Sequence, residues 1–174
     1  IDSLQTTGWV TPDGSDPAAY WTITRGDKAH AVRAVYTIPK QRNFTVGDIN
    51  QVSVVGLQGM DYLDSLEGRA HKQETSDVIR FTGEVDRLYI NTPQAVEIRD
   101  TSLHRNILVA KEGSASTVVW NPWIAKAKAM PDFGDEEYQR MVCVESGNMA
   151  LNEIRLSIGQ EARLKVNLDS SPLT

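Results

Sequence analysis

The chain has 174 residues, of which 40% are apolar and 24% are charged, a composition that supports one sizeable core. No apolar run approaches the roughly 18 to 20 residues of a membrane-spanning helix, which argues against a membrane span. The net charge of −5 reflects 18 Lys and Arg against 23 Asp and Glu, and the basic residues are scattered, which argues against nucleic acid as a partner. Because the sequence begins at Ile1 without a methionine or an apolar leader, we expect a piece of a longer protein or a processed product.

The first part of the chain predicts strands separated by turn residues. Tyr20–Thr24 and Ala29–Ile38 are predicted to form a hairpin through the turn at Arg25, Gly26 and Asp27. Gln51–Leu57 is predicted to be the next strand. The stretch from Asp64 to Asp77 carries many charges and no periodic apolar face, and is therefore predicted to be an exposed loop.

The second part of the chain continues the same pattern at a spacing of roughly 8 to 12 residues, which is typical of an antiparallel sandwich or barrel. An all-β fold is therefore expected. Eight further strands are predicted at Val78–Phe81, Asp86–Ile90, Ala95–Arg99, Asn106–Ala110, Ser116–Trp120, Arg140–Glu145, Glu153–Ile158 and Ala162–Leu168.

One stretch predicts a helix, from Pro122 to Met130. Asn121 suits the N-cap, Pro122 suits the first helical position, and alternate alanines favour the helical state. Pro131 is expected to end it, since proline cannot continue the hydrogen-bond ladder.

Metal and disulfide chemistry find little support in the sequence. The single cysteine, Cys143, can form neither an internal disulfide nor a cysteine-cluster metal site, which fits a reducing compartment, either the cytoplasm or an organelle such as a plastid. His30, His71 and His104 have no histidine partner at metal-ligand spacing and are interpreted as surface or packing residues. These residues predict no metal site.

Glu145 is the first candidate for chemistry. Strand alternation puts Met141, Cys143 and Glu145 on one face, with valines on the other. A carboxylate in so apolar a strand is costly unless it is paired or solvated, and carboxylates placed this way often act as a general base. The alternative is a glutamate at the end of a strand that reaches water.

Asp86, Trp120 and Trp123 are further candidates for binding. Aspartate is unfavourable inside a strand, so Asp86 is either functional or a turn-ending residue. The two tryptophans flank a rigid turn at Pro122, and indole rings can stack on a sugar. Core packing is the alternative role for both rings.

Three segments together resemble a known family. They are Gly56–Asp64, Gly83–Pro93 and, above all, Val118–Glu145 with its Trp-Asn-Pro-Trp and Met-Val-Cys-Val-Glu motifs. They resemble the hexose-6-phosphate mutarotases, or glucose-6-phosphate 1-epimerases, of the aldose 1-epimerase superfamily. The resemblance spans about Phe44 to Leu168 and implies part of a galactose-mutarotase-like antiparallel supersandwich. It makes residues 1–174 a single domain that lacks the family's N-terminal part.

The resemblance also implies roles for particular residues. The family interconverts α and β anomers of a hexose 6-phosphate by opening and closing the ring, which needs a base and an acid. It implies that Glu145 is the base and that Asp86 binds sugar hydroxyls, and neither role needs a metal or an organic cofactor. Trp120 and Trp123 are expected to bind substrate by stacking.

The family's acid, a histidine, is missing from the matching position. Gln41 or Arg42 stands there, depending on one gap. Glutamine cannot give and recover a proton, and arginine, with a pKa above about 12, holds its proton too tightly. The family's phosphate-binding arginines come from an N-terminal half that this chain lacks.

Two functions therefore stay open. The first is an epimerase acting on a hexose phosphate or a related sugar. The alternative is a catalytically silent mutarotase-fold subunit or carbohydrate-binding module of a larger complex. Because part of a supersandwich leaves open sheet edges, we expect either a protein partner that covers them or additional residues of the same protein.

Overall fold

A computed structural model describes residues 19–24, 32–34, 43–156 and 161–173. These residues form mostly antiparallel strands, as the sequence predicts. Gln41, Arg42 and His30, for which the sequence analysis made specific predictions, lie outside the described residues.

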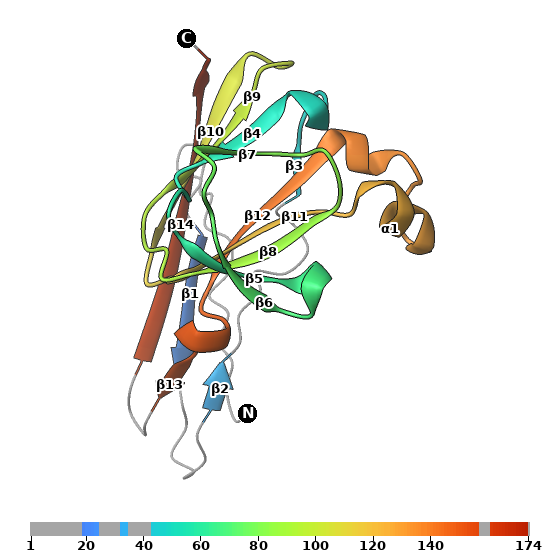
Figure 1. Ribbon diagram of the computed structural model, residues 1–174. Helices are drawn as coiled ribbons and strands as arrows, with labels where there is room; N and C mark the ends of the chain where they lie inside the picture. Colours follow the sequence, from blue (N-terminus) through green and yellow to red (C-terminus); the bar gives the residue numbers. More distant parts are fainter. Residues whose placement is uncertain (1–18, 25–31, 35–42, 157–160, 174) are drawn as a thin grey trace.

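One six-stranded sheet, here the β10 sheet, has the order β1-β14-β10-β9-β4-β7. Its long strand β14 runs between β1 and β10 (Figure 1). The bounds are β1 Ala19–Thr24, β4 Val52–Val55, β7 Val78–Arg80, β9 Val96–Asp100, β10 Arg105–Glu112 and β14 Glu161–Pro172.

The second six-stranded sheet, here the β11 sheet, has the order β3-β12-β11-β8-β5-β6. A separate pair joins β2 to β13. The bounds are β2 Val32–Ala34, β3 Asn43–Thr45, β5 Asp61–Asp64, β6 Ala70–Gln73, β8 Val85–Ile90, β11 Ser116–Asn121, β12 Met141–Gly147 and β13 Ile154–Leu156.

Helices are short in the described part of the chain. The α-helix α1 spans Trp123–Ala129 and projects away from the sheets (Figure 1). It begins one residue later and ends one residue earlier than predicted, and no helix of the described residues could cross a membrane. Four 3-10 turns complete the elements: η1 Ile49–Gln51, η2 Ser65–Glu67, η3 Glu137–Arg140 and η4 Ala150–Asn152.

The core lies between the two six-stranded sheets. Valine-rich strands alternate, so that one face of each sheet buries its side chains against the other sheet. Full burial of each such side chain contributes roughly 1.5 to 3 kcal/mol. The residues include Val52, Val54, Val96, Ile98, Val109 and Val166 from the β10 sheet, and Tyr62, Val85, Tyr89, Val119, Val142 and Val144 from the β11 sheet.

Two sequence predictions about local structure are wrong. In the described residues the first two predicted strands lie in different sheets and do not pair as a hairpin: β1 pairs with β14 and β2 pairs with β13. The predicted turn and the other residues of the second strand lie outside the described residues. The stretch from Asp64 to Asp77 is not a loop throughout, because it contains η2 and the edge strand β6. An edge strand needs no continuous apolar face, so a polar sequence is compatible with it.

The segment that joins β10 to β11 carries the chain from the β10 sheet to the β11 sheet. Gly113 has φ +70°, and a Cβ atom there would lie 1.9 Å from the carbonyl oxygen of Arg163. Only glycine fits such a position. The chain therefore passes from one sheet to the other here and brings β11 between β8 and β12.

Candidate active site

Three neighbouring strands carry the predicted site residues. In the β11 sheet, β11 is paired to β8 on one side and to β12 on the other. The register aligns Trp120 with Asp86 on β8 and with Cys143 on β12. Glu145 lies two residues further along β12, opposite Val118. Since side chains two apart on a strand share a face, the structure puts Asp86, Trp120 and Glu145 on one face.

This shared face points away from the core. Val119 and Val144, which alternate with the candidate residues, are fully buried between the sheets. Asp86 and Glu145 are partly buried, whereas Cys143, two residues before Glu145 on β12, is 4% exposed. We refer to the side of β8, β11 and β12 that bears these residues as the outer face. The sequence-predicted alternation of Met141, Cys143 and Glu145 against valines is confirmed.

The two carboxylates are close enough to influence each other. Their strands are two spacings apart, on the order of 10 Å between backbones, and side chains reduce that gap. Burial raises the pKa of Glu145, and the negative charge of Asp86 raises it further, while a hydrogen bond with the Cys143 thiol lowers it. Among the described residues, none forms an ion pair with either carboxylate. A raised pKa makes Glu145 a stronger base once it is ionised.

Asn121, at the end of β11, organises the segment that leads into α1. Its Nδ2 donates to the carbonyl oxygens of Tyr138 and Met141, both at 2.9 Å, and its Oδ1 accepts from the Trp123 N–H at 2.9 Å. The predicted N-cap is therefore displaced by one residue, because Pro122 occupies that position. The amide side chain ties the first residue of α1 to η3 and to the start of β12.

The two tryptophans differ in their surroundings. Trp120 is partly buried on the outer face, in line with Asp86. Trp123 has φ +55°, rests against the core, and packs against Tyr138 with ring centroids 5.3 Å apart. Its direct contacts correspond to the packing role that the sequence left open. Trp120 has the better position to meet a sugar.

The histidines in the described part of the chain are distant from Glu145 or exposed. The cross-strand row that contains Glu145 continues through Val118, Leu88 and Leu63 to His71, four strands away. Four spacings correspond to about 19 Å. His71 and His104 are both exposed, as expected for surface residues. Within the same part of the chain, no group of three or more acidic, histidine or cysteine side chains is arranged to hold a metal ion.

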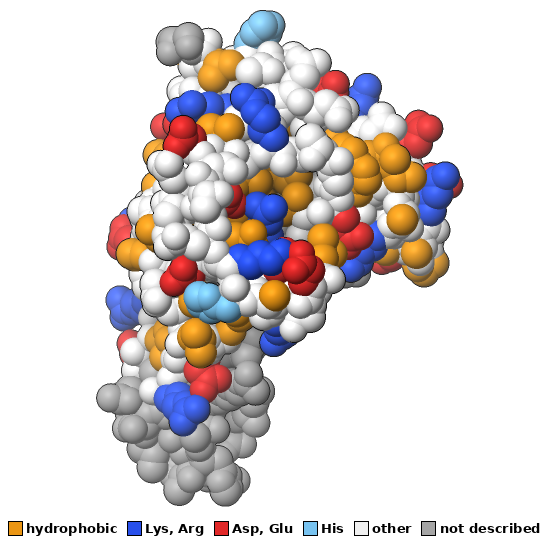
Figure 2. Space-filling model, in the orientation of Figure 1, with side chains coloured by type: hydrophobic (Ala, Val, Ile, Leu, Met, Phe, Trp, Pro, Cys, Tyr) orange, Lys and Arg blue, Asp and Glu red, His pale blue; other side chains and the backbone are white. Residues whose placement is uncertain are grey.

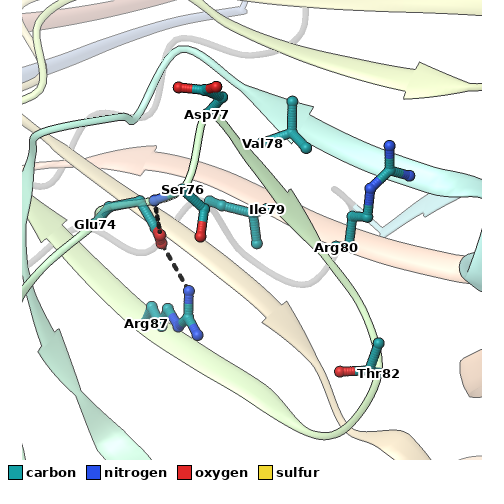
Figure 3. Close-up of a pocket in the computed structure, with 8 residues that line it drawn as sticks. All are labelled: Glu74, Ser76, Asp77, Val78, Ile79, Arg80, Thr82 and Arg87. Atoms are coloured by element: carbon teal, nitrogen blue, oxygen red, sulfur yellow. Dashed lines mark hydrogen bonds and ion pairs between the residues drawn. The ribbon is translucent and has the colours of Figure 1, made fainter.

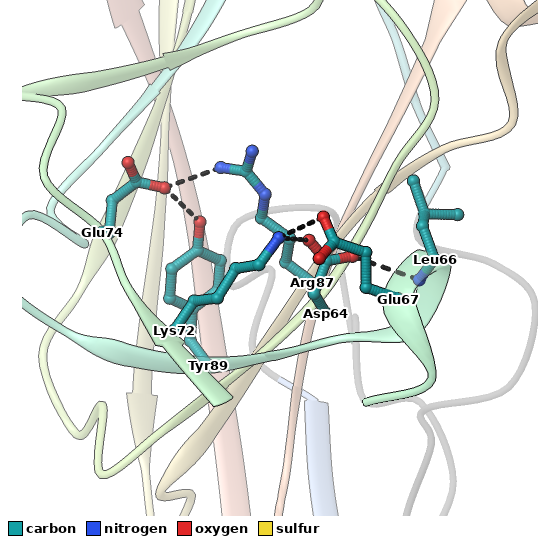
Figure 4. Close-up of polar contacts among 7 residues, drawn as sticks. All are labelled: Asp64, Leu66, Glu67, Lys72, Glu74, Arg87 and Tyr89. Atoms are coloured by element: carbon teal, nitrogen blue, oxygen red, sulfur yellow. Dashed lines mark hydrogen bonds and ion pairs between the residues drawn. The ribbon is translucent and has the colours of Figure 1, made fainter. Parts of the chain in front are cut away.

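The opposite side of β8 carries a satisfied polar cluster (Figure 4). Glu74 Oε2 accepts from Arg87 Nη1 at 2.7 Å and from the Tyr89 hydroxyl at 2.8 Å. The Arg87 guanidinium lies 4.9 Å from the Tyr62 ring centroid. We call Glu74, Arg87, Tyr89 and Tyr62 the core-side cluster. It was not predicted, because Glu74 lies in the stretch interpreted as an exposed loop.

A second ion pair extends this edge of the β11 sheet (Figure 4). Asp64 Oδ2 accepts from Lys72 Nζ at 2.9 Å, and Asp64 Oδ1 accepts from the Leu66 N–H at 3.1 Å. Burial by itself raises the pKa of Asp64, but the hydrogen bonds from Lys72 and Leu66 outweigh burial, and the pKa is lowered. These contacts fold η2 and β6 onto β5.

A cavity of about 450 Å³ opens beside the core-side cluster (Figure 3). Glu74 and Arg87 point toward each other in it, so their charges compensate. Because Arg87 and Asp86 are adjacent on β8, they face opposite sides, and this cavity does not belong to the outer face. Its lining consists of Glu74, Ser76, Asp77, Val78, Ile79, Arg80, Thr82 and Arg87.

Comparison with known proteins identifies the family. A model of the family described as "Aldose 1-epimerase" matches residues 34–169. The chain belongs to the aldose 1-epimerase family. A second model, for a domain of unknown function, matches residues 1–62. The resemblance inferred from the three sequence segments is thus confirmed, and with it the galactose-mutarotase-like antiparallel fold.

Individual relatives agree with this family. A "Putative glucose-6-phosphate 1-epimerase" from Cenchrus ciliaris is 43% identical over 137 residues, which are 79% of this chain and 41% of that protein. One of the same name from Escherichia coli is 36% identical over 103 residues, 59% of this chain and 35% of that protein. A crystal structure of a "putative mutarotase" from Salmonella typhimurium superposes with a TM-score of 0.72 at 26% identity, covering 89% of this chain and 50% of that one. The chain thus spans half or less of each relative's length.

Proposed function

We propose that this aldose 1-epimerase family member interconverts the α and β anomers of a hexose 6-phosphate. The supporting observation is that Asp86 and Glu145, 59 positions apart in sequence, share the outer face of one sheet with Trp120 between their strands. The names of the Cenchrus and Escherichia relatives support this substrate class. They also favour the epimerase over the silent binding module.

In this proposal Glu145 acts as the base. Its carboxylate takes the proton of the anomeric hydroxyl, the bond between C1 and the ring oxygen breaks, and a separate acid donates a proton to the ring oxygen. The open aldehyde turns about the C1–C2 bond, and closure on the other carbonyl face returns the proton to the opposite anomer. Burial and the charge of Asp86 raise the pKa of Glu145, which increases its basicity at neutral pH.

Asp86 and Trp120 hold the sugar in the same proposal. An ionised aspartate accepts hydrogen bonds from hydroxyl groups, and an indole face packs against the apolar face of a pyranose. Trp123, which packs against Tyr138, supports the turn next to Trp120. No described residue is assigned to the acid that protonates the ring oxygen, and the matching positions Gln41 and Arg42 lie outside the described residues.

The proposal also includes the domain organisation of the chain, its open sheet edges and its cellular compartment. Residues 1–174 are proposed to form one mutarotase-like domain, and β6 and β7 end their sheets within the described residues, which leaves edges for a partner or for further chain. With one cysteine, the chain is proposed to work in a reducing compartment, the cytoplasm or a plastid. On the face shown in Figure 2, charges of both signs are interspersed.

Anomer exchange measured by NMR tests the reaction. Addition of the chain to equilibrated α and β glucose 6-phosphate labelled at C1 is expected to accelerate exchange above the buffer rate, and Glu145→Gln is expected to abolish the acceleration. Glu112→Gln is the matched control, because Glu112 is exposed on β10 in the other sheet. Exchange at the buffer rate with the unaltered chain, or equal acceleration by Glu145→Gln, contradicts the proposal.

A further inference from the structure

Asn121 is a fully buried amide at the end of β11, one residue beyond Trp120. It is aligned with Val85 of β8, which belongs to the core, so the Asn121 side chain lies on the core side of the sheet and that of Trp120 on the outer face. Residues 122–140 leave the sheet after Asn121, and the chain returns to it at Met141, the first residue of β12. The amide therefore lies where β11 ends and β12 begins.

The partners of this amide lie on three separate segments. Its Oδ1 accepts from the N–H of Trp123, the first residue of α1, at 2.9 Å. Its Nδ2 donates to the carbonyl oxygen of Tyr138 in η3 and to that of Met141 in β12, both at 2.9 Å. Because a primary amide has two N–H donors, both are used. One side chain therefore closes the connection between β11 and β12 at both of its ends.

The same amide supports a strained turn. Trp123 has φ +55°, a left-handed conformation that bulky residues rarely adopt. Its N–H bond to Asn121 and its ring contact with Tyr138, at 5.3 Å between centroids, hold it there. Strain of this kind persists only where the surroundings determine the conformation, and it collects at functional sites. The turn after Trp120 and the first residue of β12 thus share one support.

We propose that Asn121 is a positioning residue that fixes the ends of β11 and β12 against each other and thereby sets the placement of Trp120 and Glu145 on the outer face. This inference rests on the proposed function for its consequence in catalysis. The bond to Met141 lies just beyond the pair of Trp120 and Cys143, the last aligned pair of these two strands. A slip of one residue in this register would turn Glu145 from the outer face toward the core.

A smaller displacement is sufficient to matter for the reaction. Without the amide, the Trp123 N–H and the carbonyl oxygens of Tyr138 and Met141 lose their partner, while the aligned pairs from Ser116 and Gly147 onward still join the strands. We therefore expect the end of the sheet to shift before the strands separate. A misplacement of about 1 Å costs a reaction on the order of 100-fold in rate.

NMR of two labelled side chains tests the placement without depending on catalysis. In Asn121→Ala, the ¹³C resonance of the Glu145 carboxyl and the ¹⁵N resonance of the Trp120 indole are expected to shift. Asn121→Ser is the milder variant if the alanine variant does not fold, because a serine hydroxyl can accept from the N–H two residues later but is too short to reach the two carbonyls. Val166→Ala, a fully buried truncation on β14 in the other sheet, is the control for lost stability, and both resonances are expected to stay in place.

Anomer exchange at saturating glucose 6-phosphate supplies the second readout. The rate is expected to fall roughly 100-fold in the folded Asn121 variants and to be kept in Val166→Ala. Resonances that stay fixed in a folded Asn121 variant, or that move equally in Val166→Ala, overturn the inference, and so does an unchanged rate in a variant whose resonances have moved. Resonances that move only in the Asn121 variants, in a chain that shows no exchange even when unaltered, uphold the placement and contradict the proposed reaction instead.

Discussion

Two neighbouring residues of β8, Asp86 and Arg87, face opposite sides of one sheet and have opposite surroundings. On the core side, Arg87 is paired with Glu74 and stacked near Tyr62. On the outer face, Asp86 acts on a second carboxylate, Glu145, and raises its pKa. Matched charges hold a fold together, whereas like charges close together cost stability and persist where chemistry uses them. The comparison separates a structural cluster from the residues that we propose to be functional.

The largest expected effect comes from the outer face. Glu145→Gln is predicted to reduce anomer exchange by roughly 100-fold to 10,000-fold, the usual contribution of a general base. The same change is predicted to increase the free energy of unfolding at pH 7. Folding raises the pKa of Glu145, so this side chain lowers the free energy of unfolding as pH rises from its unfolded-state pKa through its folded-state pKa. Urea unfolding of both proteins measures this. A loss of stability in the variant would place Glu145 with the structural residues.

Substitution in the core-side cluster is predicted to lower the free energy of unfolding, whereas Glu145→Gln is predicted to raise it. Glu74→Ala is predicted to destabilise the fold by roughly 3 kcal/mol, because it leaves Arg87 and the Tyr89 hydroxyl without their acceptor. Glu112→Ala, at an exposed pair with Lys165, is predicted to cost less than about 1 kcal/mol. Equal unfolding free energies for the two variants would remove the distinction between the faces.

A buried lysine, Lys111, lies where the chain passes from β10 in one sheet to β11 in the other, and it allows a third comparison. Lys111 on β10 is 9% exposed, and its Nζ donates to the Ser116 carbonyl at 2.9 Å, to Thr92 Oγ1 at 3.4 Å and to Thr117 Oγ1. Burial lowers the pKa of Lys111 to about 7. The unfolded chain then binds more protons above pH 7, so this lysine makes stability rise with pH up to its unfolded pKa.

Comparison of the unaltered chain with Lys111→Met isolates that effect. Between pH 7 and pH 9 the unaltered chain is predicted to gain about 2 kcal/mol of unfolding free energy relative to the variant. Other titrating groups cancel in the difference. Parallel stability curves across this range would mean that Lys111 stays charged in the folded protein.

The smallest expected effect concerns one hydroxyl of the core-side cluster. Tyr89→Phe is predicted to cost about 1 kcal/mol, because Glu74 loses one of its donors and keeps Arg87. Anomer exchange is predicted to be unchanged, since Tyr89 faces the core. Thermal unfolding and the exchange assay on the same sample check both parts, and a fall in exchange without a fall in stability would link the two faces.

The alternation of apolar and polar residues along single strands made many strand positions and side-chain faces predictable from the sequence. It assigned Cys143 and Glu145 to one face, and it located most central strands within one to three residues. Pairing between distant segments was not predictable in the same way. The expected hairpin of the first two strands failed because β1 pairs with β14, more than 130 residues later in the chain.

Polar residues at a sheet edge were also not predictable from the sequence. The segment containing Glu74 has the composition of a loop, yet Glu74 is 5% exposed because Arg87 and Tyr89, on another strand, meet it. The face of Glu145 followed from the sequence, but its position near Asp86 depends on the register of three strands.

Titration of the chain with a hexose 6-phosphate, observed at the ¹³C side-chain carboxyls, tests the outer face most directly. The resonances of Asp86 and Glu145 are predicted to shift together along one saturating curve, while that of Glu74 stays in place. Resonances of Asp86 and Glu145 that remain fixed, or that respond with different affinities, would contradict a single sugar site on this face.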